Sequence, residues 1–256
     1  MSRNLLTIAQ FTLLEALRNR LFYLVLLIIA VMLTFTLFLK QVAITETRDI
    51  QIAFLAAMFR LISVFILATF VIVSQVREAN DKVMELLLTR DLPRAHYLFG
   101  KLIGYLGVAL LLCALFTLPI LLFADISRTL AWGLSLFLEM AIVAALSLFC
   151  VLTLNQVVGA LAAVLASYAL ARSMAALQLI GASRLSDGDA LLDRIANYAL
   201  DGIAFFLPRL DLFTQTGWLL HRDQSSLDVP SLLLQSAVYV ALLGAAALFD
   251  FQRKNF

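Results

Sequence analysis

The run LFYLVLLIIAVMLTFTLFL, from Leu21 to Leu39, contains no charged side chain, and it decides the fold class. An apolar helix of about 20 residues is long enough to cross the ~30 Å hydrocarbon core of a bilayer. The core of a large soluble domain would instead need short apolar runs that are broken by loops. The run therefore predicts a transmembrane helix.

The remainder of the chain has the same apolar character. Of its 256 residues, 63% are hydrophobic and only 14% are charged, and the mean hydropathy is +0.98. Soluble domains usually carry about 25% charged residues, and a soluble domain this apolar would expose large adhesive patches. A β-barrel would show alternating segments of ~10 residues, which the sequence lacks. We therefore predict an all-α fold that crosses the membrane several times.

We expect a single membrane domain, residues 1–256, with six transmembrane helices. Their expected bounds are Leu21–Leu39, Ile52–Val76, Leu102–Ala124, Leu130–Leu154, Val158–Leu177 and Ser231–Phe249. No internal repeat or low-complexity tract divides the chain further.

Two segments outside the spans are also expected to be helical. Residues 3–19 place apolar side chains at roughly helical spacing with polar side chains between them, which is typical of an amphipathic helix on the membrane surface. A ragged extension of the first span is the alternative interpretation. Residues 178–230 predict an outer insertion, with an amphipathic helix that Asp189 caps and Pro208 ends, followed by a short segment that dips toward the membrane.

An even number of spans puts both termini on one side, and the distribution of Lys and Arg assigns that side. If it is cytoplasmic, ten basic residues lie inside: Arg3, Arg18, Arg20, Arg77, Lys82, Arg90, Arg94, Lys101, Arg253 and Lys254. The short outer loops then hold only Lys40, Arg48 and Arg128, as the positive-inside rule requires. Trp132 and Trp218 would lie near the outer interface, where Trp is favoured.

No catalytic motif is present. The sequence contains no G-x-x-x-x-G-K-[ST] phosphate loop, no H-E-x-x-H and no G-x-S-x-G, so we expect no enzyme activity in this chain. His96 and His221 fall on opposite sides of the membrane in the predicted topology. Cys113 and Cys150 lie inside apolar runs, and the spacing of Cys and His predicts neither a disulfide nor a metal site.

Three charged residues fall inside the predicted spans: Arg60, Glu139 and Arg172. Charges within spans are costly and are functional candidates by default. At ~1.5 Å per residue, Arg60 and Glu139 lie roughly 12–14 Å below the outer surface, and Arg172 lies roughly 8 Å below it. We therefore expect Glu139 to pair with one or both arginines, and we favour a role in holding helices together over direct contact with a substrate.

The stretch REANDKVMELLLTRDLPRAHYLFGK, Arg77–Lys101, interrupts the apolar chain between the second and third spans. Residues 77–90 have a helical pattern that includes attractive i,i+4 charge pairs. Asp91 and Pro93 predict a turn, after which a second helix runs into the third span. Charges of both signs argue against simple adsorption to anionic lipid and favour docking to another protein. A solvated connector is the alternative.

Four short stretches carry a family resemblance: LRNRLFYLVLL at 17–27, the segment 77–104, the outer PRLDLF at 208–213, and FDF at 249–251 before a short basic tail. Together with the six-span plan, they are similar to ABC-2-type transporter permeases. The resemblance extends over essentially the whole chain.

This resemblance implies the membrane subunit of an ATP-driven, ABC exporter-like complex in the bacterial inner membrane. Two copies of the chain would form the translocation path. The segment 77–101 would be a coupling element that docks on a separate ATP-binding cassette subunit, and ATP and Mg²⁺ would bind to that subunit, with no cofactor in this chain and no nucleic-acid partner. The residues implied to contact that subunit are Arg77, Glu78, Lys82, Glu85 and Arg94.

Two other roles remain open from the sequence. The chain could be a scaffold that anchors an ATPase, or an outer-face (periplasmic) protein, for assembly of another complex without transport of its own. A secondary carrier would show inverted repeats and polar sites at the membrane midplane, and neither is visible in the sequence.

Overall fold

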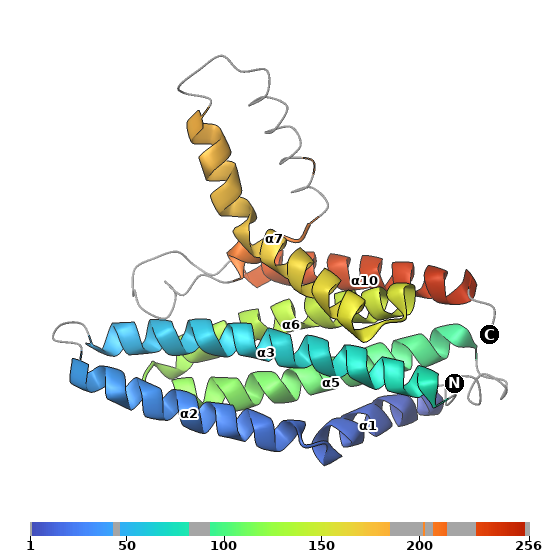
Figure 1. Cartoon of the computed structure of the whole chain (residues 1–256), viewed down its shortest axis with the longest axis horizontal. Coiled ribbons are helices and arrows are strands. Elements are labelled where there is room, and N and C mark those ends of the chain that lie inside the picture. Colours follow the sequence, from blue (N-terminus) through green and yellow to red (C-terminus); the bar gives the residue numbers. More distant parts are fainter. Residues whose placement is uncertain are drawn as a thin grey trace.

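The computed structural model describes residues 2–42, 47–81, 93–184, 202, 207–213 and 229–253, and the elements within them are all helical (Figure 1). In chain order they are α1 (Ser2–Arg18), α2 (Leu21–Val42), α3 (Thr47–Asn80), α5 (Arg94–Ile120), α6 (Ile126–Leu154), α7 (Val157–Arg184), the 3-10 turn η1 (Leu210–Leu212) and α10 (Val229–Arg253).

Six of these helices, namely α2, α3, α5, α6, α7 and α10, are long and apolar enough to cross a membrane. The prediction of an all-α fold with six spans is therefore confirmed. Most of the helices continue past the expected bounds, because a helix that leaves the hydrocarbon region keeps its backbone hydrogen bonds among polar residues. α3 starts at Thr47 rather than Ile52, and α7 continues to Arg184 rather than ending at Leu177.

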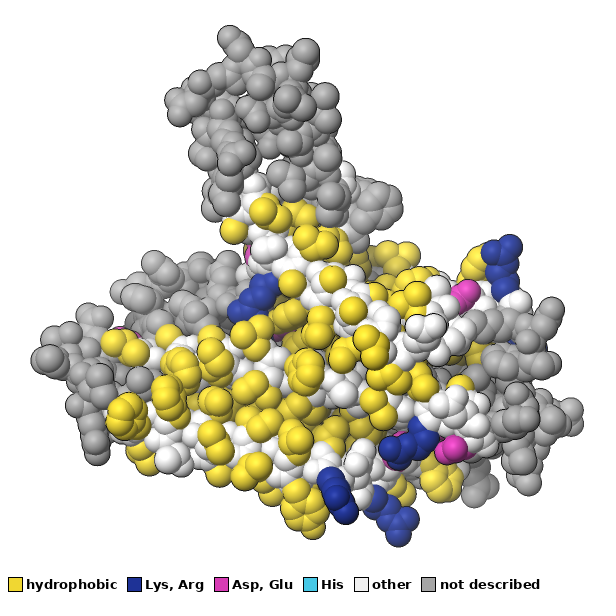
Figure 2. All heavy atoms as spheres, in the orientation of Figure 1, with side chains coloured by type: hydrophobic (Ala, Val, Ile, Leu, Met, Phe, Trp, Pro, Cys, Tyr) yellow, Lys and Arg dark blue, Asp and Glu magenta, His cyan; other side chains and the backbone are white. Residues whose placement is uncertain are grey.

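The core of the bundle is built around α6. This helix contacts α3, α5, α7 and α10, and 78% of its apolar window is buried inside the chain. By contrast, only 11% of the α2 window is buried, so α2 presents most of its apolar side chains to the surroundings of the bundle. Figure 2 shows such side chains spread over one broad side of the molecule.

Helix α1 packs along the first half of α5. A Cβ added at Gly104 would lie 2.7 Å from the Cβ of Thr12, and one added at Gly100 would lie 3.0 Å from the Cβ of Ile8. Two glycines four residues apart thus let the helix backbones approach closely, as small-xxx-small pairs do between membrane helices. The chain turns at Asn19, so α1 is a separate helix rather than an extension of the first span. Its position on the membrane surface stays a prediction.

Two helix ends follow from local sequence. α6 ends at Leu154 because Asn155 adopts a left-handed conformation with φ of 53°, which Asn tolerates better than most side chains. This turn lets α7 begin at Val157. At the other end of α6, Asp125 occupies the N-cap position, so most of the expected DISRT loop is the first turn of the helix.

The start of α1, the end of α3, the start of α5 and the end of α10 lie at the same end of the bundle (Figure 1). On the face drawn in Figure 2, Lys, Arg, Asp and Glu gather mainly toward this end. The residues between α3 and α5, 82–92, are outside the described residues, as are the predicted insertion helix around Asp189 and Trp218. That this end faces the cytoplasm stays a prediction.

Candidate functional site: two polar clusters in the bundle

The first cluster, the inner charge cluster, is centred on an ion pair between Arg60 of α3 and Glu139 of α6. Both side chains are buried, with exposed fractions of 1% and 0%. The cluster is defined as Arg60, Trp132, Ser135, Glu139, Tyr168 and Arg172. The structure therefore brings together two of the three in-span charges that the sequence singled out.

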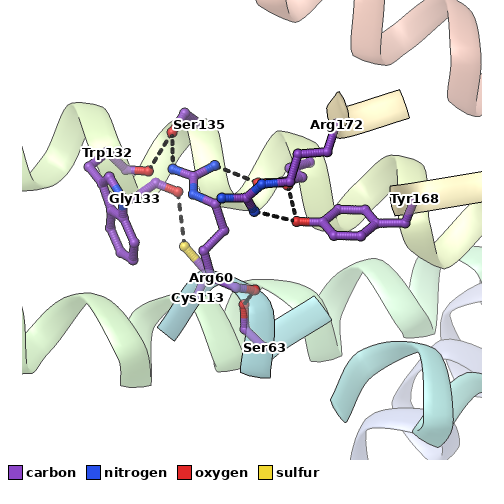
Figure 3. Close-up of polar contacts among 9 residues, drawn as sticks. Arg60, Ser63, Cys113, Trp132, Gly133, Ser135, Tyr168 and Arg172 are labelled. Atoms are coloured by element: carbon purple, nitrogen blue, oxygen red, sulfur yellow. Dashed lines mark hydrogen bonds and ion pairs between the residues drawn. The ribbon is translucent and has the colours of Figure 1, made fainter. Parts of the chain in front are cut away.

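Two further residues of α6 hold the guanidinium of Arg60. Its Nη2 donates to Ser135 Oγ at 2.9 Å, and its Cζ lies 5.2 Å from the centroid of the Trp132 ring, a cation–π distance. Residues 132, 135 and 139 occupy one face of α6 because they are spaced by three and four positions. Figure 3 shows Arg60 reaching across from α3 to this face.

The Trp132 side chain is fully buried within the bundle, and its ring is the one that Arg60 contacts. Its position near the outer membrane interface stays a prediction. The indole Nε1 is buried without a hydrogen-bond partner among the described residues.

Arg172 joins the cluster indirectly. The Tyr168 hydroxyl donates to Glu139 Oε1 at 2.8 Å and accepts from Arg172 Nη1 at 2.9 Å. Tyr168 and Arg172 are four residues apart on α7, so they share a face of that helix. The Tyr168 hydroxyl therefore connects Arg172 of α7 to the Arg60–Glu139 pair of α3 and α6.

The inner charge cluster holds two guanidinium groups and one carboxylate. An ion pair taken out of water loses much solvation energy, so it needs the added hydrogen bonds that Ser135 and Tyr168 provide here. The sequence analysis missed Ser135 and Tyr168. The i,i+4 spacing of Tyr168 and Arg172 was the one signal that could have found the bridge.

The second cluster, the polar clamp, lies at the charged end of the bundle. The carboxylate of Glu78, near the end of α3, forms an ion pair with Lys101 of α5. The Tyr97 hydroxyl, one turn earlier on α5, donates to the same carboxylate at 2.7 Å. The Lys101 side chain is 6% exposed and the Glu78 side chain 17%, so this pair is largely screened from solvent by the protein.

The clamp extends to α1 through the preceding residues of α3. Gln75 donates to Tyr97 Oη at 3.4 Å and accepts from the Tyr105 hydroxyl at 3.0 Å. Ser74 donates to the carboxylate of Glu15, at 3.0 Å for the nearer oxygen. The polar clamp, defined as Glu15, Ser74, Gln75, Glu78, Tyr97, Lys101 and Tyr105, therefore joins three helices.

The five residues predicted to contact an ATP-binding subunit differ in their surroundings. Arg77 is exposed, whereas Glu78 is turned inward to Lys101 and Tyr97. Arg94 donates to the backbone carbonyls of Phe251 and Gln252, at 3.4 and 3.1 Å, near the end of α10. Lys82 and Glu85 are outside the described residues. Contact with a partner stays a prediction for all five.

The PRLDLF stretch at 208–213 also has a defined place. Leu210 begins the turn η1 and is 2% exposed, and Phe213, which follows it, is fully buried. This turn packs against α7. The expected short segment that returns toward the membrane therefore contains an anchored turn, fixed by two apolar side chains.

Comparison with known proteins bears on both clusters. The model of a family described as ABC-2 family transporter protein matches residues 34–182. The matched region holds all residues of the inner charge cluster and the α3 and α5 residues of the polar clamp. A search of curated proteins found no significant match. Since the matched region is more than half of the chain, this multi-pass membrane protein belongs to the ABC-2 family of transporter proteins, as one of its membrane permeases.

Proposed function

We propose that this chain is the membrane-spanning subunit of an ATP-driven transporter, in which two copies form the translocation path. A separate ATP-binding cassette subunit, which binds ATP and Mg²⁺, docks on the segment that contains residues 77–101. The complex lies in the bacterial inner membrane with both termini cytoplasmic. The excess of Lys and Arg at the termini and in this segment supports that orientation.

The polar clamp is the observation that carries the coupling proposal. Segment 82–92 connects α3 to α5 in the sequence, and the Glu78–Lys101 pair ties these two helices together near the end of α3. A force on the segment would therefore move the ends of α3 and α5 as one unit. The bond between Ser74 and Glu15 extends the unit to α1.

The inner charge cluster has a different role in this proposal. Its bonds connect α3 with α6 and α7, so displacement of α3 at the clamp end is transmitted to the core helix α6. Removing one member of a buried ion pair leaves the other charge uncompensated, which costs about 3–5 kcal/mol. We assign Arg60 and Glu139 a positioning role that keeps these helices in register, rather than contact with the cargo.

The second copy is proposed to cover the least buried spans. Only 11% of the α2 window, 22% of the α10 window and 28% of the α7 window is buried within one chain. These helices offer apolar surface that lipid or an identical chain can cover. The more deeply buried α6 and α3 would remain inside each protomer.

Purification of the tagged chain from its native membrane in mild detergent tests the proposal. We expect an ATP-binding subunit to accompany it in equal amount, as identified by mass spectrometry. Arg77→Glu and Glu85→Arg should release that subunit without lowering the amount of folded permease. Arg253→Glu, a charge reversal at the same end of the bundle but outside the segment, is the matched control.

The proposal would be wrong if the chain purified alone and both reversals in segment 77–101 had no effect. Transport is tested separately, with the complex in sealed vesicles. A complex that hydrolyses ATP without any cargo-dependent change in rate would favour the scaffold role instead.

A further inference from the structure

A groove opens where α1, α2 and α3 meet, beside the polar clamp, whose members Glu15 and Ser74 line its edge. It has a volume of about 330 Å³ and is lined by residues at the end of α1, the start of α2 and the second half of α3. Figure 1 shows the bend between α1 and α2 at which it lies. Its size is within the ~300–1,000 Å³ typical of small-molecule sites.

The α3 wall of the groove changes from apolar to polar along its length. Its members, at positions 65, 66, 69, 70, 73, 74 and 77, occupy one face of the helix. From Phe65 to Arg77 the wall extends about 18 Å at ~1.5 Å per residue. Phe65 and Phe70 lie toward the apolar end, together with Leu24 of α2, while Ser74 and Arg77 lie toward the polar end.

The polar end carries a positive balance of charge. Arg20 and Arg77 both line it, opposite a single carboxylate, that of Glu15. That carboxylate is already engaged, because it accepts the Ser74 hydroxyl. Arg20 comes just before the first apolar run and Arg77 just after the second, so both residues border predicted membrane spans.

A hydroxyl lies partway along the groove without a partner. Thr69 lines it between the two phenylalanines, and its Oγ1 is buried with no hydrogen-bond partner among the described residues. Several other helical threonines in this chain, such as Thr12 and Thr36, donate to the carbonyl four residues earlier. A buried hydroxyl normally has a partner, and rotation about χ1 of Thr69 would turn this one into the groove, where it would donate to an acceptor of a bound molecule.

We propose that this groove, lined by Arg20, Arg77, Thr69 and the apolar side chains of α2 and α3, binds one anionic phospholipid. The phosphate lies between the two guanidinium groups, an ester carbonyl accepts from the Thr69 hydroxyl, and an acyl chain lies along Leu24 and Phe65. A transmembrane helix of a partner would match the apolar wall, but would leave the two arginines without an anion.

Binding of defined lipids to the purified full-length chain tests this site, and native mass spectrometry can count the bound molecules. Phosphatidylglycerol and phosphatidylcholine with identical acyl chains are compared, together with the deacylated glycerophosphoglycerol headgroup and inorganic phosphate. We expect phosphatidylglycerol to bind most tightly. The headgroup and inorganic phosphate should bind weakly, because neither reaches the apolar wall.

Four variants locate the binding. Arg20→Gln and Arg77→Gln should each weaken phosphatidylglycerol binding by about fivefold, the effect expected for one basic residue near an anionic headgroup. Thr69→Val should weaken it by a similar factor through loss of one hydrogen bond. Arg253→Gln removes the same charge from an exposed site on α10, away from the groove, and should leave binding unchanged.

Three results would overturn the proposal. Equal binding of phosphatidylcholine would remove the role of the anion, and equal binding of inorganic phosphate would indicate a simple anion site without the acyl chain. The third concerns Val73→Phe, which places a larger side chain on the wall of the groove. If it disperses a dimer but leaves the number of bound lipids unchanged, the groove is covered by a second copy of the chain.

Discussion

Glu78 and Lys101 are 23 residues apart in the chain, and their ion pair closes the bundle at the point where the chain leaves α3 and returns through α5. The Tyr97 hydroxyl binds the same carboxylate, so a single acidic side chain organises this end of both helices. From the sequence we expected Glu78 to face an ATP-binding partner. The structure gives its carboxylate two partners within the chain.

A charge exchange separates these two roles of Glu78. Glu78→Lys alone and Lys101→Glu alone each place like charges together in a largely buried site, and we expect each to cost about 3–5 kcal/mol of unfolding free energy. The double variant Glu78→Lys/Lys101→Glu restores the pair and should recover most of that loss. Thermal unfolding in detergent measures all three variants.

For the same variants, co-purification measures whether the ATP-binding subunit still associates with the permease. If the polar clamp acts within the permease, the double variant regains both stability and association. A double variant that is stable but no longer binds the subunit would instead make Glu78 a direct contact of the partner. Arg77→Glu is the matched exposed change, and of the two properties measured here it should lower association and leave the melting temperature unchanged.

Removing one member of the Arg60–Glu139 pair should be far more harmful than removing both. Glu139→Gln leaves Arg60 buried opposite a neutral amide, and we expect a loss of about 3–5 kcal/mol. The double variant Arg60→Met/Glu139→Leu replaces the pair with apolar side chains of similar volume and should be close to the wild type in stability. A double-mutant cycle by thermal unfolding gives the coupling.

The double variant also tests the positioning role. If Arg60 and Glu139 only keep the helices in register, transport by the assembled complex should survive in the stable double variant. Loss of transport with stability intact would mean that the cargo contacts these charges, and the positioning role would then be wrong.

The sequence was sufficient for the six spans and for the choice of in-span charges, because hydrocarbon thickness fixes the length of an apolar run and every buried charge is costly. The partners of those charges were harder to predict. Ser135 and Trp132 are unremarkable residues in an apolar helix until the packing of α3 on α6 places Arg60 against them. Sequence spacing defines a face of one helix, but not which neighbour meets that face.

The residues at the end of α3 also show that a sequence pattern does not identify the neighbour of each side chain. A mixed-charge stretch predicts a polar surface, and Arg77 is indeed exposed. Its neighbour Glu78 is turned inward, because α3 continues to Asn80 and one further residue rotates the side chain by about 100° around the helix. The prediction gave residues 77–90 a helical pattern but treated both residues as one docking surface, because sequence spacing does not show which face of the helix meets α5.

Loss of the hydroxyl bridge in the inner cluster should have a small, defined effect. Tyr168→Phe keeps the ring and removes the group that joins Glu139 to Arg172. We expect a loss of about 1–3 kcal/mol, since a buried charged acceptor is deprived of one donor. Tyr23→Phe, at an exposed position of α2, is the control and should not change the melting temperature. An equal effect of the two changes would contradict the bridge.

For two glycines of α5, we expect the same substitution by Ala to change stability in different directions. Gly104→Ala would place a methyl group 2.7 Å from the Cβ of Thr12, and we expect α1 to be displaced at a cost of about 1–3 kcal/mol. Gly107→Ala meets only Leu13 Cδ1 at 3.6 Å, an ordinary contact, so the better helix propensity of Ala should leave stability unchanged or raise it by up to ~1 kcal/mol.

Hydrogen exchange shows whether the effect of Gly104→Ala lies in the packing of α1. The amides of residues 2–18 should exchange faster in this variant, while those of α6, which does not depend on α1 for its packing, should be unchanged. Shortening the opposing side chain with Thr12→Gly removes the Cβ that would clash, and should restore part of the contact between α1 and α5. If Gly104→Ala and Gly107→Ala lowered stability equally, the close approach of α1 to α5 would not be what these glycines provide.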